Sequence, residues 1–115
     1  VAVALPAESE TRSKVAEAGL KVMSVAEATR WADLVMILAP DTKQRDIYKN
    51  EIAPNLSSGK AIAFGHGFAI RFGLIEAPTD IDVFLVAPKG PGNVVRSEFS
   101  NGRGVANLIA RIKKL

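Results

Sequence analysis

The sequence predicts an α/β fold: a Rossmann-like, wound and mainly parallel sheet with helices on both faces. Two observations predict it. Short apolar runs recur along the chain, and most are apolar on both faces, as buried parallel strands are. Segments with helix signals lie between these runs, so strand and helix alternate throughout. We assign strands to Val1–Leu5, Leu20–Met23, Leu34–Ala39, Ala61–Phe64, Val83–Ala87 and Val105–Ile112.

The first predicted helix lies between the first two strands. It spans Glu8–Ala18, with Ser9 as its N-cap and Gly19 as its C-terminal stop. A serine side chain accepts a hydrogen bond from a free amide at a helix start, and glycine readily adopts the left-handed conformation that ends many helices.

Two further helices are predicted from the spacing of a capping box, in which a short polar residue precedes Glu or Gln by three positions. Ser24 and Glu27 have this spacing and predict a short helix. Asp41–Gln44 repeats it, so we expect Asp41 to cap a helix that Pro54 prevents from continuing.

The composition describes one globular domain over residues 1–115, with 48% apolar residues and no need for covalent staples. The absence of cysteine excludes a disulfide scaffold and a thiolate metal site, and the single histidine excludes a histidine-cluster site. No apolar run approaches the roughly 18 residues of a membrane span, and Val1–Leu5 is too short for a signal peptide. We therefore expect a soluble, cytoplasmic protein without a membrane partner.

The net charge of +3 is concentrated near the C-terminus. Five cations lie between Arg96 and Leu115, against Glu98 as the one acidic residue of that segment. Single-strand binders add stacking aromatic rings and duplex readers add a recognisable motif, and neither accompanies these cations. We therefore expect no nucleic-acid partner.

Polar residues follow three predicted strands directly. Asp41 follows the third strand, His66 follows the fourth between two glycines, and Lys89 follows the fifth. The carboxyl ends of parallel strands meet at one edge of the sheet, which is where open α/β sheets bind ligands. We expect a site for a nucleotide or small anion at this edge.

Each of these residues also has a purely structural interpretation. Asp41 is most simply a helix cap, although a helix N-terminus also suits phosphate. His66 lies between glycines that allow close approach of a ligand. The segment Lys89–Gly92 is either a turn or a cation beside amides that contact an anion.

The run from Gly19 to Val105 resembles the N-terminal, cofactor-binding domain of ketol-acid reductoisomerase, also called acetohydroxy acid isomeroreductase. The stretches that carry this resemblance are specific when taken together. They are Ala32–Asp41, Ala53–Leu56, Phe64–Phe68, Asp82–Gly92 and Gly102–Val105.

The resemblance implies an NADP-dependent reduction that follows an Mg²⁺-dependent alkyl shift, in the pathway to branched-chain amino acids. It implies catalytic positions at His66 and Lys89. It implies cofactor-binding positions in the loop beside the cofactor, at the nucleotide glycine and at the hydroxyls after the first strand. These cofactor-binding positions are Asp41, Thr42, Lys43, Gln44, Gly92, Ser9 and Thr11.

Departures from the family pattern shape our expectation of activity. The chain starts at what looks like the family's second strand, without the glycine-rich turn for the pyrophosphate. Pro6 occupies the position of an arginine that serves the adenosine-side phosphate. The helical domain with the Mg²⁺ ligands is absent, so we expect no metal ligands here and no catalysis by this chain alone.

Three functions stay open from the sequence. The chain is a fragment or component of a ketol-acid reductoisomerase, an anion- or nucleotide-binding module without catalysis, or an engineered or evolutionary α/β structural module.

The family's first strand is central, so its absence leaves two inner strand edges to be satisfied. We expect Val1–Leu5 to pair directly with Leu34–Ala39. The alternatives are a strand from the C-terminal segment or from a second copy of the chain, which is a homodimer through the exposed sheet edge.

Overall fold

The computed structural model describes residues 1–113, which alternate between strands and helices as the sequence predicts. Between α3 and β4 the chain forms a π-helical turn, η1, and a 3₁₀ turn, η2. The elements are β1 (Ala2–Ala4), α1 (Thr11–Glu17), β2 (Lys21–Met23), α2 (Val25–Trp31), β3 (Leu34–Ile37), α3 (Asp41–Ile47), η1 (Tyr48–Ile52), η2 (Ala53–Asn55), β4 (Ala61–Phe64), α4 (Phe68–Arg71), β5 (Asp82–Pro88), α5 (Gly92–Ser100) and β6 (Asn107–Lys113).

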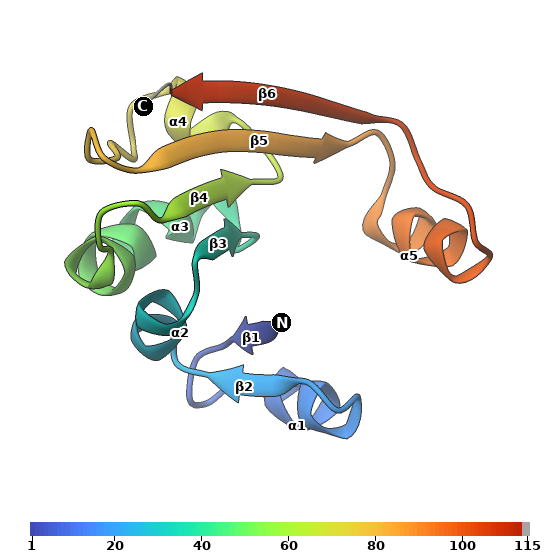
Figure 1. Ribbon diagram of the computed structural model, residues 1–115. Helices are drawn as coiled ribbons and strands as arrows, with labels where there is room; N and C mark the ends of the chain where they lie inside the picture. The colour runs from blue at the N-terminus through green and yellow to red at the C-terminus, as the bar shows by residue number, and fades with distance from the viewer. Residues whose placement is uncertain (114–115) are drawn as a thin grey trace.

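The strands form two sheets (Figure 1). β1 and β2 make a two-stranded parallel sheet, and the other sheet has the order β3-β4-β5-β6. β3, β4 and β5 are parallel, whereas β6 runs antiparallel to β5. The wound, mainly parallel α/β class is thereby confirmed.

The predicted pairing of Val1–Leu5 with Leu34–Ala39 is wrong, because among residues 1–113 β1 is bonded to β2 alone. A strand from the C-terminal segment does not replace it, since β6 lies beyond β5. Our energetic argument assumed that the inner edges are buried. The side chains of Leu34 and Leu38 are instead 50% and 71% exposed, so water can satisfy the nearby backbone.

The core lies against one face of the four-stranded sheet. Ile62, Phe64 and Val83 are almost fully buried there, and α3 with the turns that follow it covers them with Tyr48 and Ile52 (Figure 1). Side chains alternate between the faces of a strand. Leu34 and Met36, at 50% and 40% exposure, therefore point to a second face that is open.

The capping box at the start of α2 is confirmed. Ser24 Oγ accepts a hydrogen bond from the Glu27 amide at 3.2 Å, and a Glu27 carboxylate oxygen accepts one from the Ser24 amide at 3.1 Å. These bonds stabilise the carboxylate and lower the pKa of Glu27. Gly19 has a φ of +77°, as expected for the residue that ends α1.

Two predicted caps are wrong by one position. The N-cap of α3 is Pro40, so Asp41 is the first helical residue and its side chain makes no capping bond. Pro40 also lacks the N–H that a reciprocal box requires. The N-cap of α1 is Glu10, although Ser9 Oγ still accepts a hydrogen bond from the Thr11 amide at 3.3 Å.

Pro54 does not end the helical course at once. It lies within η2, in the first turn where proline needs no amide partner, and the chain becomes extended at Leu56. No helix within residues 1–113 is long and apolar enough to cross a membrane.

Candidate functional site

The strand register places three predicted site residues at the same edge of the four-stranded sheet. Ile37, Phe64 and Leu85 are register partners across β3, β4 and β5. His66 follows two residues after Phe64, and Asp41 and Lys89 each follow four residues after their strand's partner. Because adjacent strands lie about 4.8 Å apart, the carboxyl edge carries all three residues.

His66 is exposed at this edge, and its ring orientation is fixed by one hydrogen bond. The Phe68 amide donates to His66 Nδ1 at 3.2 Å, at the start of α4. An accepting Nδ1 carries no proton, so the neutral ring has its proton on Nε2. His66 therefore presents an N–H donor on its other nitrogen.

Gly65 allows the ends of β3 and β4 to approach each other. A Cβ atom at this position would lie 3.0 Å from Leu38 Cδ2. A side chain here would therefore push against Leu38 at the base of the loop that carries His66.

The residues at the start of α3 divide into two groups. Thr42 and Lys43 are exposed and Asp41 is half-buried, so all three are accessible from solvent. Gln44 is only 3% exposed, and its Nε2 donates to the Ala39 carbonyl at 2.7 Å. Its side chain holds the loop after β3, and its Oε1 has no hydrogen-bond partner among the described residues.

Lys89 and Gly92 are exposed in the connection between β5 and α5. The Lys89 amide donates to the Ala106 carbonyl at 2.8 Å, which ties this connection to the segment before β6. A Cβ atom at Gly92 would meet nothing within 4 Å. The space beside Gly92 is therefore open to a ligand.

Ser9 and Thr11 lie on the other sheet, after β1, and no hydrogen bond given by the structure joins them to His66 or Lys89. Beside them is a cation that our sequence reasoning missed. Arg12 Nη1 donates to the Leu5 carbonyl at 2.8 Å, which brings the guanidinium back to the end of β1. The one available signal was a cation directly after Thr11 in the first helical turn.

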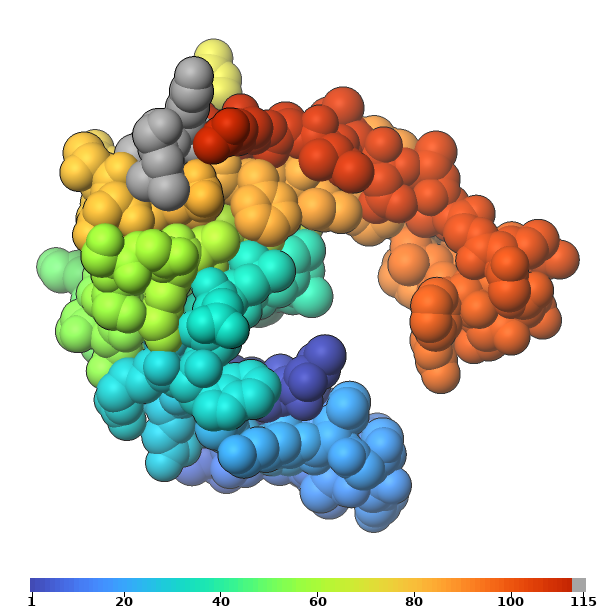
Figure 2. Space-filling model, viewed as in Figure 1, coloured from blue at the N-terminus to red at the C-terminus, as the bar shows by residue number. Residues whose placement is uncertain are grey.

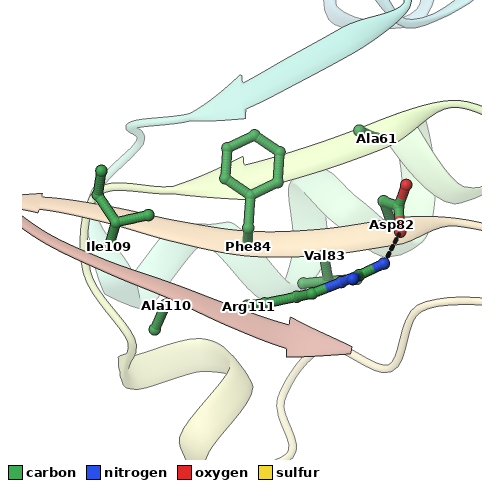
Figure 3. Close-up of a pocket in the computed structure, with 7 residues that line it drawn as sticks. All are labelled: Ala61, Asp82, Val83, Phe84, Ile109, Ala110 and Arg111. Atoms are coloured by element: carbon green, nitrogen blue, oxygen red, sulfur yellow. Dashed lines mark ion pairs between the residues drawn. The ribbon is translucent and has the colours of Figure 1, made fainter. Parts of the chain in front are cut away.

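One hollow of about 310 Å³ lies away from these residues, at the amino ends of β4 and β5 (Figure 3). In the view, Phe84 and Ile109 point to the same side of the sheet, and Arg111 reaches toward Asp82 with a nitrogen–oxygen distance of 3.6 Å. Its lining is mostly apolar. The residues are Ala61, Asp82, Val83, Phe84, Ile109, Ala110 and Arg111.

A second hollow, of about 190 Å³, lies at the carboxyl edge between α3 and α4. Asp41 and Thr42 line it from α3, and Phe68 and Leu74 line it from the other side, with Arg45 and Asp46 completing the lining. Two of the predicted cofactor-binding residues therefore share a concave surface.

The described residues fit an anionic nucleotide in part and do not fit Mg²⁺. Exposed cations and hydroxyls at Lys43, Thr42 and Lys89 are donors for phosphate. In contrast, residues 1–113 contain no group of three or more His, Cys, Asp or Glu side chains that could hold a metal ion.

Comparison with known proteins gives a consistent family. Residues 1–114 match the family described as acetohydroxy acid isomeroreductase, NADPH-binding domain. A ketol-acid reductoisomerase (NADP(+)) from Saccharopolyspora erythraea is 60% identical over 110 residues, which cover 96% of this chain and 33% of the relative.

Solved structures agree with this. An NADH-preferring ketol-acid reductoisomerase from an uncultured archean is 39% identical with a TM-score of 0.89, over 96% of this chain and 34% of that one. A putative oxidoreductase from Jannaschia sp. CCS1, 19% identical with a TM-score of 0.76 over 99% of this chain and 44% of that one, shares the fold. The chain spans about a third of the length of its reductoisomerase relatives.

Proposed function

Because the chain belongs to the ketol-acid reductoisomerase family, we propose that it binds NADPH for the reductive step of branched-chain amino acid biosynthesis. The observation that supports this most directly is the strand register, which gathers Asp41, His66 and Lys89 at one carboxyl edge. Open α/β sheets bind nucleotides at this edge.

NADPH, when bound, supplies a hydride. The chain's own contribution is to bind and orient it. The Lys89 and Lys43 ammonium groups and the Thr42 hydroxyl are exposed donors for phosphate oxygens. The open space beside Gly92 allows the nucleotide to approach the backbone.

His66 is the proposed catalytic donor toward substrate. With Nδ1 held by the Phe68 amide at 3.2 Å, its Nε2–H is directed to another partner. Such a donor can hydrogen-bond an oxygen of an acetohydroxy acid and stabilise negative charge that develops there.

The end of β1 is the proposed site for the adenosine-side phosphate. The hydroxyls of Ser9 and Thr11 lie next to Arg12, whose guanidinium is held by the Leu5 carbonyl. Arg12 can supply the cation at this end of the sheet, where Pro6 stands at the family's arginine position.

We propose further that the 115 residues bind the cofactor without turning over substrate. The described acidic residues do not fit the Mg²⁺ on which the family's alkyl shift depends, and the relatives are about three times longer. We therefore derive no step through that metal.

The test is a titration of the chain with NADPH, followed by nicotinamide fluorescence. We expect saturable binding, and we expect Lys89→Ala to weaken it about tenfold, since a charge-assisted hydrogen bond contributes about 1.5–3 kcal/mol. Lys49→Ala is the control, because Lys49 is an exposed cation in η1, before β4.

Equal losses in the two variants would mean that NADPH senses only the overall charge. No binding of NADPH or ADP would instead favour a structural α/β module.

A further inference from the structure

Two strand edges of this chain have no strand partner. β1 is bonded only to β2, and β3 only to β4, within residues 1–113. Each therefore has one row of backbone N–H and C=O groups available to another strand. Figure 2 shows the surface hollowed between the N-terminal residues, in blue, and the teal residues of β3.

These inner edges lack the features that protect exposed edges. β1 and β3, with sequences AVA and LVMI, contain no charged residue and no proline. The outer strands differ: β2 begins with Lys21, and β6 contains Arg111 beside a register irregularity. Charged side chains and bulges discourage edge-to-edge pairing, so pairing is discouraged only at the outer edges.

The side chains beside the inner edge of β3 are apolar and exposed. Leu34, Met36 and Leu38 are 50%, 40% and 71% exposed. On the other side of the opening, residues 1–23 include no buried residue, so the β1–α1–β2 unit is weakly held by packing. Moving this unit to a better partner sacrifices few contacts and covers apolar surface.

We propose that two copies of this chain exchange their β1–α1–β2 units, so that β1 of each copy pairs with the free edge of β3 of the other. The occupant is a second copy because each chain carries both edges, and both are uncharged. Reciprocal exchange satisfies both inner edges at once and closes by two-fold symmetry. It yields a dimer rather than an open-ended series.

The test is the mass of the full chain in solution, by light scattering over a range of concentrations. We expect a dimer that dissociates on dilution. Leu34→Lys places a charge beside the inner edge and should shift the dissociation constant at least tenfold toward monomer. Leu108→Lys is the matched control, since Leu108 lies on the outer strand β6 and is also 50% exposed.

A second variant, Met36→Lys, keeps the test decisive should Leu34→Lys fail to fold. A wild-type chain that stays monomeric at all concentrations, species that grow beyond a dimer, or equal effects of Leu34→Lys and Leu108→Lys would overturn the proposal. Exchange also predicts slow amide hydrogen exchange at Val35 in the dimer and fast exchange in the monomer.

Discussion

Arg12 folds its guanidinium over the end of β1 and leaves it beside two hydroxyls. The position is suited to a phosphate because arginine offers several N–H donors in a planar fork, and Nη1 already anchors the group on the Leu5 carbonyl. An anchored cation loses less conformational entropy on binding than a free one. Arg12 is therefore a residue that can distinguish NADPH, with its additional phosphate, from NADH.

We predict that Arg12→Ala weakens NADPH binding about tenfold while changing NADH binding little, since one charge-assisted contact is lost only with the phosphorylated nucleotide. The measurement is the ratio of the two dissociation constants by fluorescence titration. Lys14→Ala, an exposed cation on the same helix, is the control. Equal losses for both nucleotides would assign Arg12 to holding the loop after β1.

The elements are joined by a cation at the end of α2. Lys60 Nζ donates to the carbonyls of Thr29 and Arg30 at 2.6 and 2.7 Å. These are among the last carbonyls of the helix, which lack partners within it and carry the negative end of its dipole. Arg30 also donates to Asn55 in η2 at 2.6 Å, so the end of α2 is held from two directions.

We predict that Lys60→Met lowers the free energy of unfolding by about 1–2 kcal/mol, because two hydrogen bonds from a charged donor are lost while the aliphatic stem is kept. Urea unfolding followed by circular dichroism measures this. Lys49→Met should leave the midpoint nearly unchanged. A midpoint shift as small as that of the control would show that water replaces Lys60 at these carbonyls.

The same scale shows what the sequence could and could not predict. Ala61–Phe64 was assigned as a strand with its observed bounds, because a short apolar run flanked by glycine and lysine has few alternatives. The box at Ser24 was predictable because both partners are local. The expected box at Asp41 was not formed, since Gln44 turned inward to a carbonyl that only the folded loop supplies.

For the candidate site, sequence order predicted which strand end carries Asp41, His66 and Lys89. The exposed or buried state of each side chain depended on packing. Gln44 belongs to a contiguous run of expected cofactor contacts, yet it is buried while Thr42 is exposed. A helix turns about 100° per residue, so adjacent residues necessarily face different surroundings.

On the scale of the whole molecule, the chain curves around an open hollow (Figure 2). The core is confined to one face of the four-stranded sheet, and the N-terminal unit contributes no buried residue to it. The arrangement of strands was not predictable from local patterns, because strand pairing is decided by which edges meet water. Our sequence argument treated the edges beside Leu34 as buried, and they are exposed.

This organisation leads to the last prediction, which concerns turnover. Migration of an alkyl group in an acetohydroxy acid needs the ketol to be polarised, and a Lewis acid contributes several kcal/mol to that step. The described acidic side chains do not converge as ligands, whereas His66 and the nucleotide contacts lie at the carboxyl edge. We therefore expect the 115-residue chain, supplied with Mg²⁺, NADPH and an acetohydroxy acid, to bind the nucleotide without consuming it. The loss of reduced nicotinamide absorbance measures turnover, with the Saccharopolyspora erythraea reductoisomerase as the positive control. Consumption of NADPH that His66→Ala abolishes would contradict this prediction, because a contaminating enzyme would not respond to a substitution in this chain.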